Sequence, residues 1–417
     1  MTATILQDPL TLPCGQILPN RMMKSALSEA LADASKGPSE RLERLYGTWS
    51  NGGYGLIVTG NVMVDRRQLG EPGNVVIEDD RHLPGLTRWA KSSQDGGSPI
   101  WMQINHPGRQ ANALIARSQP VAPSAIKMRV PGAGKPRALS GQEIEDIISR
   151  FATTATVAEA AGFNGVQLHA AHGYLVAQFL SPLSNTRQDE WGGSPENRMR
   201  FALEVIARIR ASVTPGFAVG IKLNSADFQR GGFTEEESKD VVAKLAAAEV
   251  DLIEISGGSY ESPAMMGQGK TQSTIDREAY FLEYAQTVRE VAGDVPLAVT
   301  GGFRTRHAME SAVATGACDV VGIGRPTATT PDAANVILDS THDELPTHKI
   351  RFGVRPVAGK VADLKTLDGA MDLQWHADQL KRLGSGFEPD LKRPWWKSAG
   401  SMIKHNGIDA FRSKRGK

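Results

Sequence analysis

Eight short apolar runs alternate with longer amphipathic segments along this chain, and that alternation limits the folds open to it. The runs begin at Arg21, Gly55, Pro99, Gly165, Phe217, Asp251, Val295 and Asp319. Each is nearly continuous in apolar residues and rich in β-branched ones, as expected of strands covered on both faces. A strand followed by a helix, eight times over, predicts an α/β fold of the (β/α)8 TIM-barrel type, with a doubly wound sheet as the alternative.

The segments between the runs carry helix start and stop signals. Ser140 with Glu143, and Thr234 with Glu237, have the three-residue spacing of a capping box. Gly162 follows the first of these segments and predicts its end. The spacing of apolar residues in both segments is helical, so each is expected to cover the outside of the barrel.

Two parts of the chain do not follow the alternation. Residues 106–140 are rich in Pro, Gly and Ala and predict an inserted loop or hairpin over the barrel mouth, after the third strand. Residues 346–417 show weak periodicity and predict a C-terminal extension outside the barrel, which itself is expected over residues 1–345. The extension holds 15 Lys/Arg against 7 Asp/Glu, whereas the rest of the chain is net negative. We interpret it as a solvated basic tail, with a subunit contact or an anion contact as alternatives.

Composition excludes several classes of protein. The 417 residues have a net charge of +1, so no field suited to nucleic acid is expected. Two cysteines, Cys14 and Cys318, are too few for a disulfide framework, an iron–sulfur cluster or a four-cysteine zinc site, which fits a reducing compartment. No basic-then-apolar leader and no uninterrupted apolar run of membrane-spanning length is evident. We therefore predict a cytoplasmic protein without a membrane span or a metal.

Polar residues gather where the predicted strands end, and in a barrel those ends form the active site. The ends hold Ser25 to Ser28, Thr59–Gly60–Asn61, Gln103 with Asn105–His106, His169 with His172, Lys222 with Asn224, Gly301–Gly302 and Gly324–Arg325. Glycines let backbone N–H groups approach an anion, and arginine adds a charged fork. The last two ends therefore predict a phosphate site. No G-x-G-x-x-G follows a strand, so a built-in dinucleotide-binding domain is not expected.

Three residues of the fourth strand end, His169, His172 and Tyr174, form the densest polar cluster. On an extended strand the two histidines would face opposite ways, whereas a helical turn after the strand would put them on one face. They could then bind one acceptor atom together. A structural role is the alternative, and a metal site is disfavoured because no further ligand of the usual spacing accompanies them.

The stretch that begins at His169, "HAAHGYLVAQFLSPLSNTRQDEWGGSPENRMRF", resembles the central signature of the old yellow enzyme family of flavin-dependent ene-reductases, in its His/His form. "LPNRMMKSALSEA", "QINHPGRQ", "TGGFRT" and "IGRP" resemble its other motifs, so the likeness covers about residues 5 to 345. It implies an FMN-containing barrel that takes hydride from NAD(P)H and reduces the activated C=C bond of an enone or enal.

The resemblance also implies roles for the strand-end residues. His169 and His172 would bind the substrate's carbonyl oxygen, and Tyr174 would deliver a proton. FMN would be held by Ser25, Ala26, Leu27, Ser28, Gly60, Gln103, His169, Lys222, Gly301, Gly302, Gly324 and Arg325. Lys222 stands where relatives usually have arginine near flavin N1 and O2, and Ser28 where they have threonine or cysteine. Both departures put the flavin potential, not flavin binding, in question.

Other interpretations stay open at this stage. A redox-neutral isomerase or cyclase on the same scaffold is one alternative, and a non-catalytic flavin-binding protein is another. Tyr260, Met265 and Met266 could line the substrate pocket or only pack. A homo-oligomer, dimer or tetramer, is expected from the family, and Arg351 or Arg355 could reach a neighbouring active site or remain solvated.

Overall fold

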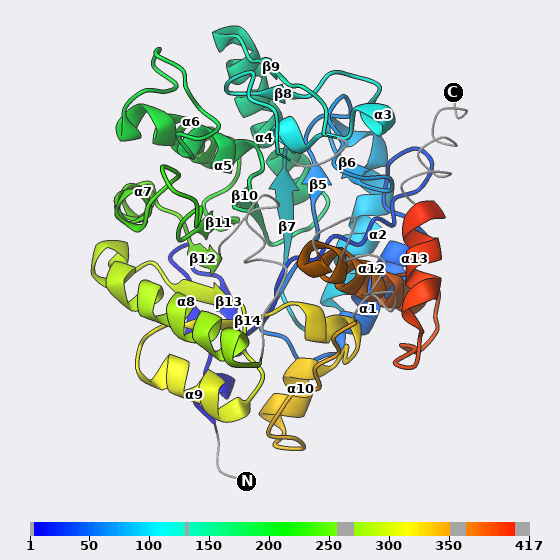
Figure 1. The fold of residues 1–417 in the computed structure, drawn as a ribbon. Coiled ribbons are helices and arrows are strands. Elements are labelled where there is room, and N and C mark those ends of the chain that lie inside the picture. The colour runs from blue at the N-terminus through cyan, green and yellow to red at the C-terminus, as the bar shows by residue number, and fades with distance from the viewer. Residues whose placement is uncertain (1–3, 130–132, 257–270, 351–363, 405–417) are drawn as a thin grey trace.

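Eight parallel strands close into a barrel at the centre of the molecule (Figure 1). The structure is a computed structural model that describes residues 4–129, 133–256, 271–350 and 364–404. The barrel strands are β3 (Met22–Lys24), β4 (Leu56–Val58), β7 (Ile100–Asn105), β10 (Gly165–Ala170), β11 (Ala218–Asn224), β12 (Leu252–Ser256), β13 (Leu297–Thr300) and β14 (Val320–Ile323). Since β14 pairs with β3 and β10 pairs with β7, the eight strands form a closed ring, and the predicted (β/α)8 barrel is confirmed.

A helix follows each barrel strand and covers its outer face (Figure 1). In chain order these are α1 (Glu40–Ser50), α2 (Leu83–Gln94), α4 (Gly141–Ala160), α6 (Pro195–Arg210), α7 (Glu235–Ala247), α8 (Thr271–Ala292), α9 (Arg306–Ala314) and α10 (Ala333–Leu338). Both predicted capping boxes are formed, at Ser140 with Glu143 and at Thr234 with Glu237. Gly162 has φ of +89°, the left-handed conformation that ends α4.

A short hairpin closes the amino-terminal end of the barrel. It consists of β1 (Leu10–Thr11) and β2 (Ile17–Leu18), which pair antiparallel just before β3. Its Leu12 and Leu18 pack with Trp101 in a buried cluster inside the barrel. The indole Nε1 of Trp101 donates to the Gln16 side chain at 2.8 Å. Because this end is filled, a ligand has to enter from the carboxyl ends of the strands.

Asp251 fixes the hairpin to the barrel. Its carboxylate accepts hydrogen bonds from the backbone N–H of Cys14 at 2.8 Å and of Val219 at 2.6 Å. It also pairs with the guanidinium of Arg210. The residue is 1% exposed, so these three partners replace the water that a buried carboxylate would otherwise require.

The insertion after the third barrel strand is a loop and not a hairpin. It contains η3 (Gly108–Gln110), α3 (Ala113–Ala116), β8 (Val121–Ala122) and β9 (Arg137–Ala138). The two short strands pair in parallel, with Val121 opposite Arg137, so the chain must cross over between them instead of turning back. Between β4 and α2 lie β5 (Val62–Met63), β6 (Val75–Val76) and η2 (Asp80–His82).

The C-terminal extension packs on the barrel of its own chain. Its helix α12 (Leu364–Gly384) lies against α1 and against η5 (Arg325–Ala328), the short helix that follows β14 (Figure 1). Arg41 and Arg44 of α1 donate to the last carbonyls of α12, at Lys381 and Gly384, both at 3.0 Å. These bonds satisfy acceptors that a helix end leaves open.

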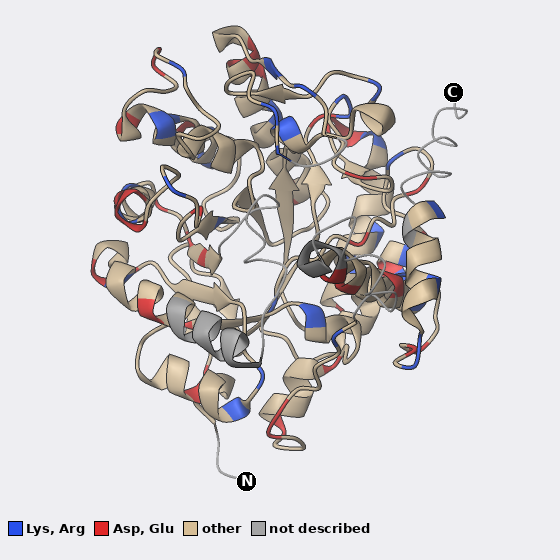
Figure 2. Ribbon diagram, in the orientation of Figure 1, with Lys and Arg blue, Asp and Glu red and all other residues tan. Residues whose placement is uncertain are grey.

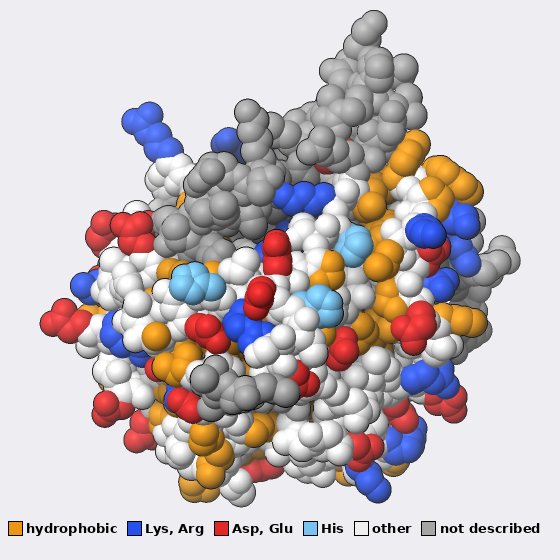
Figure 3. Space-filling model, turned by 90° about the horizontal axis from the view of Figure 1, so that it is seen from below, with side chains coloured by type: hydrophobic (Ala, Val, Ile, Leu, Met, Phe, Trp, Pro, Cys, Tyr) orange, Lys and Arg blue, Asp and Glu red, His pale blue; other side chains and the backbone are white. Residues whose placement is uncertain are grey.

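The outer part of the extension exposes apolar side chains. Phe387, Leu391, Trp396 and Ile403 are exposed in and around α13 (Trp395–Ile403). Figure 3 shows hydrophobic side chains gathered on the right, the side where Figure 1 places α13. Figure 2 shows charged residues mainly on the surrounding helices and loops, with few on the central strands. Arg351, Arg355, Tyr260, Met265 and Met266 lie outside the described residues.

We predict that Asp251→Ala destabilises the protein by about 2–3 kcal/mol, because it leaves the N–H groups of Cys14 and Val219 without their acceptor and takes the carboxylate from the half-buried Arg210. Asp343→Ala is the matched control: Asp343 also faces an arginine, Arg306, but its side chain is 98% exposed. Its loss should change stability by less than about 0.5 kcal/mol. Urea titration followed by tryptophan fluorescence measures both, and equal losses would contradict the role of Asp251.

Candidate active site

His169 and His172 meet at the carboxyl end of β10. Nε2 of His169 lies 3.1 Å from Nδ1 of His172, so the two rings can address one acceptor. The two histidines were expected to converge through a helical turn after the strand. They do converge, but through a different backbone conformation. His172 has φ of +60° and Gly173 φ of +75°, so a left-handed turn reverses the chain before α5 (Leu175–Leu180) begins.

Three side chains from other strand ends hold this histidine pair. Asn61, after β4, places Oδ1 2.9 Å from Nδ1 of His169. Ser256, the last residue of β12, places Oγ 2.9 Å from Nε2 of His172. Asn224, the last residue of β11, accepts the backbone N–H of His172 at 3.2 Å. Sequence reasoning gave none of the three a role, although each stands at the end of a predicted strand, and that position was the signal.

Tyr174 completes the polar cluster. Its ring centroid lies 4.6 Å from that of His169, with the planes tilted by 56°. Its hydroxyl oxygen lies 3.4 Å from Nδ2 of Asn61. Tyr174 is buried, so its phenol lies next to the histidine pair without being open to bulk water.

Both histidines of the pair are neutral. Burial lowers the pKa of His169 well below its ordinary value and that of His172 to about 3, and the neighbouring Lys222 ammonium lowers both further. A neutral imidazole carries one N–H and one acceptor nitrogen. The pair can therefore donate hydrogen bonds, but it does not supply a positive charge.

A chain of buried polar side chains crosses the barrel interior below the pair. Gln103 on β7 donates to Gln167 on β10 at 2.7 Å, and Gln167 donates to Glu254 on β12 at 2.8 Å. The other carboxylate oxygen of Glu254 faces Lys222 on β11 at 2.8 Å. Gln103 and Lys222, predicted from separate strands, thus belong to one network. Glu254 was missed, although a carboxylate inside an apolar run was its signal.

The end of β3 supplies hydroxyl groups whose partners lie within the protein. The Ser25 and Thr300 hydroxyls are 2.7 Å apart, and Ser28 donates to the Glu71 carboxylate. Burial raises the pKa of Glu71. Ala26 and Leu27 are half-buried between the two serines.

The Gly60 N–H also has partners in this structure. It donates to Oε1 of Glu29 at 2.9 Å and lies 3.0 Å from the Tyr46 hydroxyl. Tyr46 donates in turn to the Glu29 carboxylate. The Gly60 N–H can therefore contact a cofactor, as predicted, only if its bond to Glu29 is shared or exchanged.

The residues predicted to bind phosphate lie at the ends of β13 and β14. Gly301 and Gly302 have φ of +141° and +95°, a region that only glycine adopts without strain. Gly324 precedes η5. Nη1 of Arg325 donates to Oδ2 of Asp372 in α12 at 2.6 Å. The extension thus reaches the predicted phosphate site of its own barrel, which the sequence did not indicate.

This set of residues fits FMN in its chemistry. The group offers a planar edge of alternating donors and acceptors and a doubly charged phosphate. The barrel offers an amide at Gln103, an ammonium at Lys222, hydroxyls at the end of β3, and glycines beside an arginine. At Gly301 a Cβ would meet the Phe281 ring at 3.3 Å, so the backbone there is closely packed and favours glycine.

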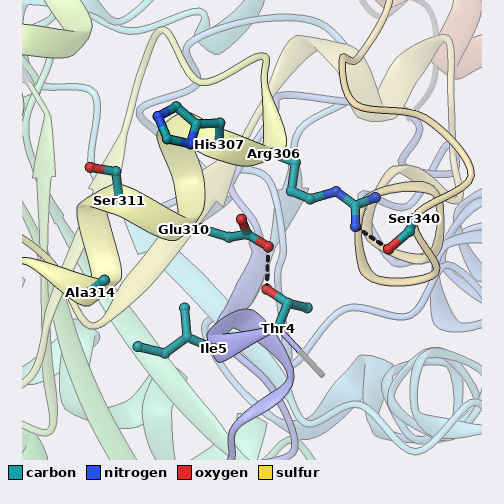
Figure 4. A pocket seen from close by; sticks show the side chains of 8 residues that line it. All are labelled: Thr4, Ile5, Arg306, His307, Glu310, Ser311, Ala314 and Ser340. Carbon is teal, nitrogen blue, oxygen red and sulfur yellow. Dashed lines mark hydrogen bonds between the residues drawn. The ribbon is translucent and has the colours of Figure 1, made fainter. Parts of the chain in front are cut away.

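A separate open pocket lies beside α9 and η1 (Ile5–Gln7), as Figure 4 shows. None of its eight lining residues belongs to the polar network described above. Its polar groups bond one another: Thr4 donates to Glu310 at 2.6 Å and Arg306 to Ser340. Among the described residues there is no group of three or more metal-ligating side chains placed to hold an ion. Nor is any helix there long and apolar enough to cross a membrane.

Residues 6–344 match the NADH:flavin oxidoreductase / NADH oxidase family. The chain belongs to this family. It is 41% identical over 349 residues to the NADH-dependent flavin oxidoreductase iliE of Hypocrea jecorina, covering 78% of this chain and 86% of that one. It is 36% identical over 410 residues to the NADH-dependent flavin oxidoreductase iccE of Talaromyces variabilis, covering 91% and 98%. The chain is therefore an oxidoreductase of the flavin-dependent kind, and the predicted family is confirmed.

A solved structure shares the fold. The old yellow enzyme homologue of Zymomonas mobilis superimposes with a TM-score of 0.69 over 83% of this chain and 94% of that one, at 24% identity. At this identity the likeness supports the barrel alone. It agrees with the strand order and closure found here.

We predict that stability falls as the pH is lowered from 7 to 5, in part through buried histidines. Burial lowers the pKa of His106 to about 4. The unfolded chain binds a proton near pH 6.5 while folded His106 does not, so folding loses about 2 kcal/mol at this residue by pH 5. Between pH 7 and pH 5, the free energy of unfolding of His106→Gln should therefore fall by about 2 kcal/mol less than that of the wild type, as measured by urea titrations at several pH values. Parallel curves for wild type and variant would contradict this.

Proposed function

We propose that the protein is an FMN-dependent ene-reductase, which takes hydride from NADH and reduces the C=C bond of an α,β-unsaturated carbonyl compound. The observation that carries the proposal is the neutral pair His169 and His172, with nitrogens 3.1 Å apart beside the Tyr174 phenol. The family membership supplies the flavin and NADH chemistry.

The histidine pair would bind the carbonyl oxygen of the substrate. Addition of hydride to the β-carbon moves negative charge onto that oxygen, and N–H donors placed in advance stabilise it. A donor of this kind is worth roughly 3–4 kcal/mol in strong cases, since a buried site strengthens the interaction. Neutral rings suit this task because they donate without first forming a buried ion pair with the substrate.

Tyr174 would donate the proton that the α-carbon requires. A phenol fixed next to the carbonyl clamp can act as a general acid once charge has accumulated on the substrate. Its burial excludes competing water from that carbon. The three side chains thus divide the work between stabilising the oxygen and protonating the carbon.

FMN would be held by Gln103 and Lys222 in the barrel, by Ser25 to Ser28 at its rim, and by Gly60. Gly301, Gly302, Gly324 and Arg325 would hold the phosphate. The bound cofactor supplies hydride transfer. Lys222 already pairs with Glu254, so the two together bring no net charge to the ring. We also propose an enone or enal substrate, a homo-oligomeric state and a cytoplasmic location.

The decisive experiment separates the two half-reactions by rapid mixing without air. In the wild type, NADH should bleach the flavin absorbance, and 2-cyclohexenone should restore it with formation of cyclohexanone. In Tyr174→Phe, the rate of flavin reduction by NADH should stay within about twofold of the wild-type rate. The rate of reoxidation by 2-cyclohexenone should fall by about 10²-fold or more, the usual range for a general acid. A colourless protein that FMN cannot reconstitute would refute the proposal. Isomerisation of substrate without net NADH use would favour the isomerase alternative.

The pairing of Arg325 with Asp372 yields a second prediction. A carboxylate beside the phosphate site repels a doubly charged ligand, so Asp372→Asn should tighten FMN binding by about tenfold. Riboflavin, which lacks the phosphate, should bind unchanged. Asp378→Asn is the matched control, because Asp378 is equally buried in α12 but pairs with Arg393 within the extension. Fluorescence titration of the deflavinated protein measures these affinities, and a weaker FMN affinity in Asp372→Asn would contradict the repulsion.

A further inference from the structure

The histidine pair raises a proton-counting question. Two neutral rings carry two N–H groups between them. Nε2 of His169 and Nδ1 of His172 face each other at 3.1 Å, so one donates and the other accepts. To bind a carbonyl oxygen with two donors, both of these nitrogens must carry a proton. The resting pair and the substrate-binding pair therefore differ in the tautomer of one ring.

The outer nitrogens of the pair decide which ring changes. Nε2 of His172 faces the Ser256 hydroxyl at 2.9 Å, and Asn224 holds the His172 backbone N–H. A hydroxyl that donates to Nε2 leaves the ring proton on Nδ1, the nitrogen that faces His169. His172 is then a donor toward the shared position, with or without substrate.

His169 faces a partner that can act in two ways. Asn61 presents Oδ1 to Nδ1 of His169 at 2.9 Å, and an acceptor there holds the ring proton on Nδ1. Nε2 is then free to accept from His172, which accounts for the contact between the rings. If the Asn61 amide turns over, its NH2 faces Nδ1 instead. The proton must then reside on Nε2, toward the substrate.

We infer that Asn61 and Ser256 are positioning residues that set the tautomers of the histidine pair, with the Asn61 amide switching it between a self-bonded and a two-donor state. The use of this switch in carbonyl binding rests on the proposed function, whereas the contacts that set the tautomers do not. The switch moves one proton: it leaves Nδ1 of His169 to solvent, and a proton from solvent binds Nε2, with no change in net charge.

The neutrality of both rings supports this arrangement. A charged imidazolium ring carries a proton on both nitrogens, so no neighbouring residue would be needed to set its tautomer. Burial, the contact between the rings and the Lys222 ammonium all keep His169 uncharged. Asn61 Nδ2 also lies 3.4 Å from the Tyr174 hydroxyl, so the same turn would bring Oδ1 beside the proton donor. One amide thus contacts both the carbonyl clamp and the acid.

The test is ¹⁵N NMR of the oxidised holoenzyme labelled at histidine, with His169→Gln and His172→Gln to assign the signals. Without ligand, both rings of the wild type should be protonated at Nδ1. Excess 4-chlorophenol, whose oxygen mimics the charged carbonyl, should move the His169 proton to Nε2 and leave His172 unchanged. Signals that do not respond to 4-chlorophenol, or a His169 ring protonated at Nε2 from the start, would overturn the inference.

Three variants separate positioning from general structure. Asn61→Asp offers only acceptors, so His169 should keep its Nδ1 proton with and without 4-chlorophenol. Its enone half-reaction should slow about tenfold or more, as when a group orienting a histidine is lost, while reduction by NADH stays within about twofold. Ser256→Ala should spread the His172 proton over both nitrogens. Ser93→Ala, which removes a buried hydroxyl bonded to Trp89 O, should change nothing.

These outcomes are independent of the proposed reaction. If the wild type fails to reduce 2-cyclohexenone but its His169 tautomer switches, the proposed function fails and the inference stands. If enone reduction is intact and Asn61→Asp loses the Nδ1 proton on adding 4-chlorophenol, the inference fails alone.

Discussion

Closure of the parallel sheet between β14 and β3 is the constraint on which the rest of the molecule depends. All eight strands then end at one rim, because parallel strands in a closed ring share their direction. Residues that are up to 195 positions apart in the chain, from Asn61 to Ser256, become neighbours of the same two histidines. With the opposite end filled by Leu12, Leu18 and Trp101, this rim is the side left for chemistry.

Much of this could be predicted from the sequence because it is encoded locally. The eight apolar runs became the eight strands, and the capping boxes at Ser140 and Thr234 formed as spaced. Most of the site residues could be predicted from the strand ends, because a polar residue that directly follows a buried apolar run seldom serves only to pack the core. In this way His169 meets His172, and Gln103 is linked to Lys222 through Gln167 and Glu254.

What the sequence did not reveal depends on contacts between distant residues. The left-handed turn at His172 has no strong local signal, because histidine adopts positive φ only when its surroundings require it. The pairing of Arg325 with Asp372 joins the barrel to an extension whose periodicity is weak. The insertion that holds the parallel β8–β9 pair was expected as a loop or a hairpin, because Pro and Gly mark turns without fixing the direction of the next segment.

Buried charge is handled in two different ways around the rim. Lys222 is balanced by Glu254 inside the barrel. Lys24, at the end of β3 and fully buried, instead donates to the carbonyl of Val58 at 3.1 Å and lies 4.0 Å over the Trp49 ring. Burial lowers the pKa of Lys24 to about 8, and the Glu29 carboxylate opposes that shift.

Glu29 in turn holds the Gly60 N–H and the Tyr46 hydroxyl, so the start of the active-site rim is fixed by a carboxylate whose charge also supports Lys24. Replacing any one of these groups would leave a buried polar partner without its hydrogen bond, so substitutions at these positions should have coupled effects on stability. The Asn61 amide, from the residue next to Gly60, contacts both His169 and Tyr174, so the start of the rim is joined directly to the histidine pair and the phenol.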